Sequence, residues 1–281
     1  MGKILETAQP AEELELDPEK YKIKAFLAGR SGSGKTQSAI TLPGRKLLLD
    51  HDNRSETVAG TPNLEIIKIL EPEPRSPRAW QKAEAILTEI NTAITKKTFP
   101  YDAIIPDGLT MMGRHSMNWS LLLDPGRGLG GAPARQHYLP QMDTLSKYVL
   151  RMLALPVHVC ITGHMELFED EEMGGHKLYP KITGKLRSEV ENWFNECYFC
   201  YRRKGEKGEG TRYYWMTAGS GREEFFKSSM NSLGRFWNDP IPLDFSKGKP
   251  VGFQDLLERR FGKRASEKRT NTKKEGGGRE K

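Results

Sequence analysis

Cysteine is scarce in this chain, and long apolar runs are missing from it. The 281 residues include three cysteines, Cys160, Cys197 and Cys200, which are too few and too odd in number for a disulfide framework. No stretch approaches the roughly 18 apolar residues of a membrane span, and the first six residues, Met-Gly-Lys-Ile-Leu-Glu, contain no signal-peptide core. We therefore expect a soluble protein of a reducing cytoplasm, with no membrane partner.

Two weak metal patterns fail on their spacing. Cys197-Tyr-Phe-Cys200 resembles half of a zinc site, but no second pair accompanies it, and residues three apart on a strand point to opposite faces. Asp50-His-Asp-Asn53 begins like a calcium loop but lacks the glycine at the sixth position and the distal glutamate. Neither pattern predicts a metal site.

The formal net charge of +7 is concentrated at the end of the chain. Residues 262–281 carry eight basic and three acidic side chains and so account for +5 of it. This composition predicts a disordered basic tail, which either attracts nucleic-acid phosphates or only keeps the protein soluble. The acidic residues 1–20 indicate a flexible arm, and residues 21–261 indicate one domain.

Strand and helix patterns alternate through the first 162 residues. Apolar runs predict strands at 23–28, 46–50, 65–70, 103–107 and 157–162, and three-and-four spacing predicts helices at 36–41, 78–97 and 138–153. Further patterns predict a Gly-rich loop at 124–136, a C-terminal antiparallel hairpin at 196–203 and 212–217, and a last helix at 253–261. The expected fold is α/β, with a mainly parallel sheet flanked by helices.

The strongest motif is a phosphate-binding loop between the first predicted strand and helix. Gly29-Arg30-Ser31-Gly32-Ser33-Gly34-Lys35-Thr36 matches the pattern Gly, four residues, Gly-Lys-Ser/Thr, and Gln37 follows it. In such loops the backbone amides bind phosphates, the lysine contacts the β- and γ-phosphates, and the hydroxyl binds magnesium. We expect a P-loop nucleoside triphosphatase whose ligands are ATP and Mg²⁺.

Two acids complete the predicted site. A second magnesium ligand is expected at the end of a neighbouring buried strand, and Asp107 occupies that place despite the unusual Pro106 before it. Asp50 and Asp52 follow another strand and, by alternation, can point to one side. We favour Asp52 as the base that positions the attacking water, with a purely structural acid as the alternative.

The order of these parts resembles the RecA-like ATPases, most closely the phage nucleotide-binding proteins of the Sak-four single-strand annealing and recombinase group. The resemblance covers residues 21–229 and rests on the P-loop strand, the strand ending in acids, the Walker B strand ending at Asp107, and strand 157–162 followed by Gly163-His164. The later segments Tyr-Pro-Lys-Ile-Thr-Gly-Lys-Leu at 179–186 and Trp-Phe-Asn-Glu at 193–196 look like the signature of this group.

The resemblance implies roles for individual residues. His164 matches the polar residue that senses the γ-phosphate, although a histidine that caps the strand end is the alternative. Lys227 resembles a basic residue that is supplied to the nucleotide of a neighbouring subunit, with Arg222 as its competitor. Asp52 matches the strand-two acid, where this family usually carries a glutamate.

The resemblance also implies a function in DNA recombination or single-strand annealing, in the host cytoplasm if the source is a phage. The implied partners are single-stranded DNA, further copies of the chain assembled on it, and a single-strand-binding or other recombination protein. The loops expected at residues 124–136 and 165–185 would face the DNA, although the acidic run at 166–172 opposes this. The alternatives are a nucleotide-switched DNA-binding module without essential hydrolysis, a small-molecule phosphotransferase and a DNA-packaging motor.

Overall fold

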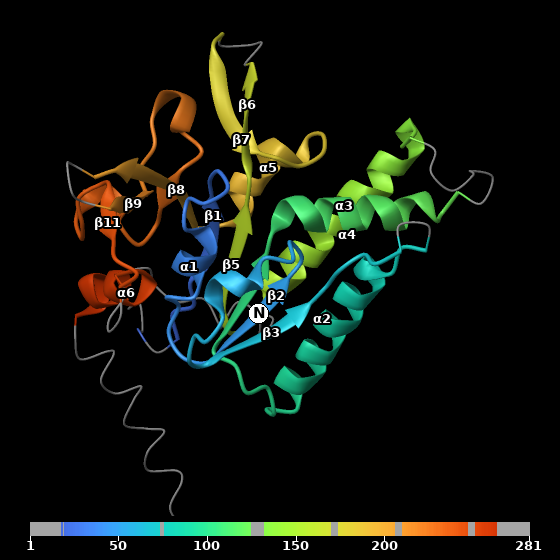
Figure 1. Cartoon of the computed structure of the whole chain (residues 1–281), viewed down its shortest axis with the longest axis horizontal. Coiled ribbons are helices and arrows are strands. Elements are labelled where there is room, and N and C mark those ends of the chain that lie inside the picture. Colours follow the sequence, from blue (N-terminus) through green and yellow to red (C-terminus); the bar gives the residue numbers. More distant parts are fainter. Residues whose placement is uncertain are drawn as a thin grey trace, which may run out of the picture.

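The computed structural model describes residues 18, 20–73, 76–124, 132–169, 174–205, 210–246 and 251–262. Their centre is a nine-stranded sheet in the order β11-β9-β8-β1-β5-β4-β2-β3, with β10 paired to β8 (Figure 1). The strands are β1 (Lys24–Ala28), β2 (Lys46–Asp50), β3 (Leu64–Lys68), β4 (Ala103–Asp107), β5 (His158–Gly163), β8 (Glu196–Lys204), β9 (Thr211–Met216), β10 (Lys227–Ser228) and β11 (Ile241–Leu243).

The strands from β8 to β3 are parallel to one another, so their carboxyl ends lie along one edge of the sheet. Both faces are covered. One face packs against α2 (Ala79–Thr95), α3 (Leu109–Leu121), α4 (Arg135–Leu153) and α5 (Leu186–Trp193), and the other against α1 (Lys35–Ala39) and α6 (Phe253–Phe261). This burial on both sides explains why β1, β2, β4 and β5 appear in the sequence as continuous apolar runs.

Alternation along the strands fills two separate cores. Phe26 belongs to the core under α2 to α5, and its neighbour Leu27 belongs to the core under α1 and α6. Cys197 and Cys200 likewise lie in opposite cores, as the strand spacing predicted. The predicted α/β fold with a mainly parallel sheet is therefore confirmed.

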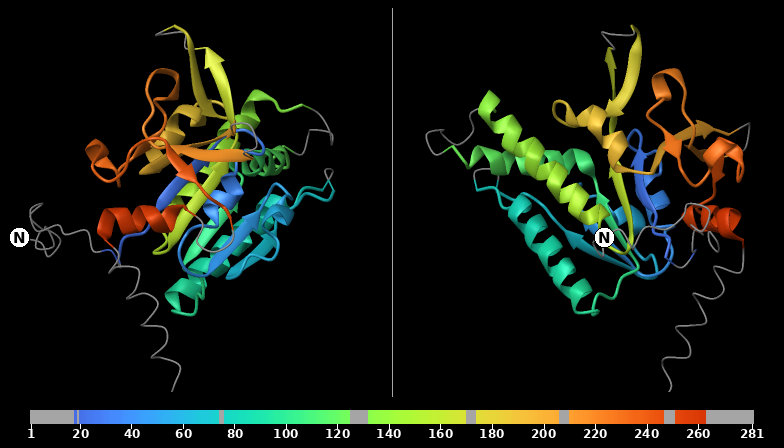
Figure 2. Two further views of the ribbon diagram at one scale, coloured as in Figure 1. Left: turned by 60° about the vertical axis from the view of Figure 1, so that its left-hand side comes forward. Right: turned by 180° about the vertical axis from the view of Figure 1, so that it is seen from behind.

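Two parts of the fold differ from the sequence-based expectation. Helix α3 was not predicted, because its buried face includes Gly113, His115, Ser116 and Ser120 and so lacks a clear apolar stripe. Residues 165–185, expected as a loop, contain the antiparallel hairpin β6 (Met165–Glu169) and β7 (His176–Pro180), which forms its own sheet. This hairpin continues from β5 and projects from the body of the molecule in every view (Figure 2).

The predicted C-terminal hairpin is present as β8 and β9, which pair in antiparallel fashion. Its first strand also pairs in parallel with β1, so the hairpin extends the main sheet. Residues 125–131 of the predicted Gly-rich loop lie outside the described residues. The predicted arms at 1–20 and 262–281 also lie outside them, except for residues 18, 20 and 262. None of the helices in the described chain combines the length and the apolar character of a membrane span.

Candidate nucleotide site

The P-loop follows β1 at the carboxyl edge of the sheet, where only glycine fits at certain positions. A Cβ added to Gly29 would lie 2.3 Å from the carbonyl oxygen of Cys200 on β8, so the loop can leave β1 only without a side chain there. Gly34 has a φ of +85°, in the left-handed region that side chains disfavour, and it places Lys35 and Thr36 at the start of α1. The motif predicted from the sequence therefore has the backbone it needs.

The interior of the loop has polar groups suited to an anionic ligand. The Nζ atom of Lys35 donates to the carbonyl oxygens of Gly29 and Arg30, each at 3.0 Å, and burial lowers the pKa of this ammonium. The hydroxyl of Ser33 and the Oδ1 atom of Asp52 are buried and have no hydrogen-bond partner within the described chain. Buried groups without partners are rare in proteins, and they are expected where a polar ligand docks. The site thus fits a bound nucleotide.

The two predicted magnesium ligands meet. The Thr36 hydroxyl donates to Oδ2 of Asp107 at 2.8 Å, and the Asp107 carboxylate is almost fully buried. A third residue, Thr162 at the end of β5, donates to the other oxygen, Oδ1. Strand β5 lies between β1 and β4, which explains why its terminal side chain reaches Asp107. Carboxylate and hydroxyl oxygens are hard ligands of the kind that Mg²⁺ prefers, so this donor set fits magnesium.

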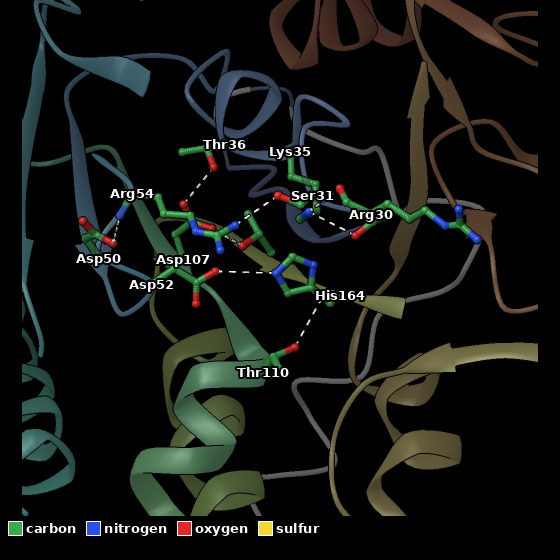
Figure 3. A network of polar contacts seen from close by, with 12 residues as sticks. Arg30, Ser31, Lys35, Thr36, Asp50, Asp52, Arg54, Asp107, Thr110 and His164 are labelled. Carbon is green, nitrogen blue, oxygen red and sulfur yellow. Dashed lines mark hydrogen bonds and ion pairs between the residues drawn. The ribbon is translucent and has the colours of Figure 1, made fainter. Parts of the chain in front are cut away.

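Asp50 and Asp52 turn out to have different partners. The two oxygens of Asp50 accept hydrogen bonds from the amides of Arg54, at 3.3 Å, and Ser55, at 3.2 Å, and so hold the start of the short helix η3 (Ser55–Val58). Strand β2 ends at Asp50, and beyond it the Asp52 carboxylate turns toward the P-loop and His164 (Figure 3). Burial, with a further contribution from Asp107, raises the pKa of Asp52 to about 6. Of the two acids, Asp52 belongs to the site.

His164 lies across the site from Asp52. Its Nε2 atom is 3.8 Å from Oδ2 of Asp52, and burial, followed by the charge of Lys35, lowers the pKa of the imidazole. The backbone of His164 joins two other elements, because its amide donates to the Thr110 hydroxyl on α3 and its carbonyl accepts from the Lys181 amide just after β7. A change at His164 therefore has a direct covalent and hydrogen-bonded route to the β6–β7 hairpin.

Arg54 is a site residue that the sequence analysis missed. Its Nη1 atom donates to the hydroxyl of Ser31 in the P-loop at 3.1 Å, so the side chain reaches from the start of η3 to the loop (Figure 3). Its positive charge also acts on Asp52, Lys35 and His164. The sequence shows only an arginine two residues after the predicted base, and no known motif includes an arginine at that position.

We call Lys35, Thr36, Asp52, Arg54, Asp107, Thr162 and His164 the P-loop cluster. Two other predicted residues, Gln37 and Lys227, make their contacts outside it. The Gln37 side chain donates to the carbonyl oxygen of Thr57 in η3. Lys227 lies on β10 and lines a cavity of about 580 Å³ with Leu233 and Trp237 among its neighbours. Within the described chain, no hydrogen bond or ion pair joins Lys227 to the other predicted site residues, and Arg222 pairs with the adjacent Glu223. Lys227 pairs with Cys197 near the start of β8, whereas the P-loop follows the carboxyl end of β1.

One family of known proteins matches most of the chain. The AAA_24 family, described as an AAA domain, matches residues 21–223. One similar solved structure is described as a prototypical ATPase from the type III secretion system of pathogenic bacteria. The TM-score of this match is 0.43, and the two sequences are 12% identical. The match covers 65% of this chain and about half, 52%, of that ATPase. No curated protein matches the sequence. With its P-loop, its paired Thr36 and Asp107, and a family match over most of its length, the chain is a P-loop nucleoside triphosphatase that belongs to the AAA_24 family.

Proposed function

We propose that this protein is a magnesium-dependent ATPase of the RecA-like, Sak-four type that acts in DNA recombination or single-strand annealing. The observation that supports hydrolysis best is the position of Asp52. Its carboxylate faces the P-loop cluster, and its buried Oδ1 atom has no hydrogen-bond partner within the described chain. A carboxylate placed in this way can orient a water molecule for in-line attack on the third phosphate and accept its proton.

Each residue of the cluster has a role in this proposal. Lys35 binds the β- and γ-phosphates and offsets the charge that develops in the transition state. Thr36 and Asp107 would hold magnesium, which neutralises phosphate charge when bound. Thr162 keeps the Asp107 carboxylate in place through its hydrogen bond. His164 registers the third phosphate and transmits its presence to the β6–β7 hairpin through the Lys181 amide.

The DNA and oligomer parts of the proposal follow from the family resemblance and from Lys227. This lysine pairs with Cys197 near the start of β8, whereas the P-loop follows the carboxyl end of β1, which is compatible with a basic residue that acts on a neighbour's nucleotide. In the proposal, subunits assemble on single-stranded DNA, with a single-strand-binding or other recombination protein as a further partner. The competing proposal is a DNA-binding module in which ATP binding alone switches the conformation.

The proposed function is tested by ATP hydrolysis with purified protein, with and without single-stranded DNA. We expect slow turnover that DNA stimulates, and turnover per subunit that rises with protein concentration because Lys227 needs a neighbour. The Lys35→Ala variant should lose the basal turnover and its stimulation by DNA, because it lacks the ammonium that binds the third phosphate. Turnover that is indifferent to DNA and to concentration would contradict the recombination proposal while leaving the ATPase assignment in place.

We further expect Arg54 to distinguish ATP from ADP. Its guanidinium reaches the P-loop hydroxyl of Ser31 beside Asp52, where a third phosphate would offer it a charged acceptor. Loss of such a charge-assisted bond should weaken binding of a non-hydrolysable ATP analogue about 10-fold in Arg54→Ala, with ADP affinity unchanged. Isothermal titration calorimetry measures both affinities.

The control for this measurement is Arg45→Ala. Arg45 pairs with Glu65 on the exposed surface, so its loss should leave both nucleotide affinities unchanged. An equal loss of ATP-analogue and ADP binding in Arg54→Ala would show that Arg54 does not contact the third phosphate.

A further inference from the structure

The β8–β9 ribbon presents two different faces, because neighbouring residues on a strand point to opposite sides. Cross-strand partners share a face. The pairs Cys200 with Trp215 and Arg202 with Tyr213 lie on one face, and the pairs Phe199 with Met216, Tyr201 with Tyr214 and Arg203 with Arg212 lie on the other. We call these the inner face and the outer face.

The inner face lies against the nucleotide loop. A Cβ added to Gly32 would lie 3.4 Å from the guanidinium of Arg202, and one added to Gly34 would lie 3.1 Å from the ring of Tyr213. The Trp215 indole donates to the hydroxyl of Ser38 on α1 at 3.1 Å. The ribbon and the P-loop are therefore in direct contact along this face.

The outer face carries a row of stacked rings. Tyr201 stacks on Tyr214 with centroids 5.4 Å apart and an interplanar angle of 18°, and Phe199 stacks on Tyr201 at 5.9 Å and 22°. The guanidinium of Arg203 lies 5.3 Å from the Tyr201 ring and 5.7 Å from the Tyr214 ring. Both tyrosines are half-buried and Arg203 is exposed. Phe199 continues the row into the core through Phe226, so the stack has a rigid base.

The net charge of the ribbon is positive and attracts a polyanion, whereas the net charge of the β6–β7 region is negative. Residues 201–214 contain the five basic residues Arg202, Arg203, Lys204, Lys207 and Arg212 against Glu206 and Glu209, a net charge of +3. Residues 165–185 contain five acidic residues against three lysines, a net charge of −2. Aromatic rings at a partly exposed surface beside arginines are the combination that binds single strands, because bases can stack on rings while the phosphates pair with the cations.

We propose that the outer face of the β8–β9 ribbon, centred on Tyr201, Tyr214 and Arg203, is a binding site for single-stranded DNA. This inference rests on the proposed function and assigns the DNA to a surface different from residues 124–136 and 165–185. DNA and nucleotide then occupy opposite faces of the same two strands. The two strands connect the DNA face to the P-loop, so we expect the two sites to be coupled, and DNA and nucleotide would then change each other's affinity by the same factor.

The test is fluorescence anisotropy with a labelled oligothymidylate and the full-length protein. Replacing both rings, in Tyr201→Ala/Tyr214→Ala, should weaken binding about 10-fold or more, because each base–ring stack contributes appreciably to affinity. Tyr201→Phe/Tyr214→Phe keeps the rings and should bind like the wild type. Hydrolysis of ATP in the absence of DNA should be the same in all three proteins, which also shows that they fold.

An abasic oligonucleotide of the same length separates stacking from simple charge attraction. It keeps every phosphate, so wild-type protein should bind it about 10-fold more weakly than oligothymidylate if the rings hold bases. Equal binding of the two, or unchanged binding by the double-alanine variant, would overturn the proposed site. Wild-type protein that hydrolyses ATP but binds neither oligonucleotide would overturn the DNA function as well. Protein that binds DNA through these rings but hydrolyses no ATP would overturn only the proposed hydrolysis.

Discussion

Asp52→Asn should lower kcat for ATP hydrolysis by about 10²- to 10⁴-fold, the usual contribution of a positioned general base. The asparagine has nearly the same shape as the aspartate but cannot accept a proton from water. It also removes the negative charge that Asp52 places near Asp107, so binding of an ATP analogue should not weaken. Single-turnover hydrolysis and equilibrium nucleotide binding, measured on the same protein, separate the two effects.

Asp50→Asn is the matched control, since it makes the same chemical change two residues away. Asp50 accepts the amides of Arg54 and Ser55 on separate oxygens, so an asparagine keeps only one of these two bonds. Its kcat should still fall by only about tenfold or less, because Asp50 contacts the backbone of Arg54 and Ser55 and does not act on the attacking water. If Asp50→Asn proved as damaging as Asp52→Asn, the assignment of the base would be wrong.

Glu196→Ala should reduce the free energy of unfolding by about 3–5 kcal/mol, among the largest effects expected for a single substitution. The Glu196 side chain is fully buried and accepts hydrogen bonds from the Tyr198 hydroxyl, the Ser228 hydroxyl, the amide and hydroxyl of Ser229, and the Met230 amide. Removal of the carboxylate takes an acceptor from each of these donors, although the Ser229 amide still reaches the Asn195 carbonyl at 3.1 Å and the Tyr198 hydroxyl lies 3.5 Å from that of Ser228. Urea denaturation with linear extrapolation measures the loss.

Glu189→Ala is the control for burial. Glu189 is exposed on α5 and lies 3.4 Å from Lys185 one turn earlier, so its removal should cost less than about 0.5 kcal/mol. A Glu196→Ala protein as stable as Glu189→Ala would show that the donors find other acceptors. The expected loss would also loosen the segment after Lys227, whose backbone Glu196 fixes to β8.

The sequence predicted those parts of the molecule whose determinants are local. The P-loop is a contiguous motif, and the central strands appear as apolar runs because both of their faces are buried. The meeting of Thr36 with Asp107 followed from the chemistry of magnesium, which needs both ligands.

The remaining site residues come together only through strand order. Thr162 reaches Asp107 because β5 lies between β1 and β4, an order that no local pattern specifies. Strand alternation gives Asp50 and Asp52 the same side, whereas the end of β2 at Asp50 lets only Asp52 turn into the site. Arg54 reaches Ser31 because η3 folds back toward the loop, held by Asp50. None of these three arrangements has a sequence signature.

The position of β1 in the sheet also bears on how the chain matures during synthesis. Its two neighbours are β5 and β8, and the Ile23 amide bonds to the ring of His158, 135 positions further along. Such distant pairings carry a large loop-closure cost and make folding slow. The carbonyl of Cys200, which packs against Gly29, leaves the ribosome later still. The phosphate loop at residues 29–36 can therefore take its final form only after Cys200, about 160 residues further along, has been made.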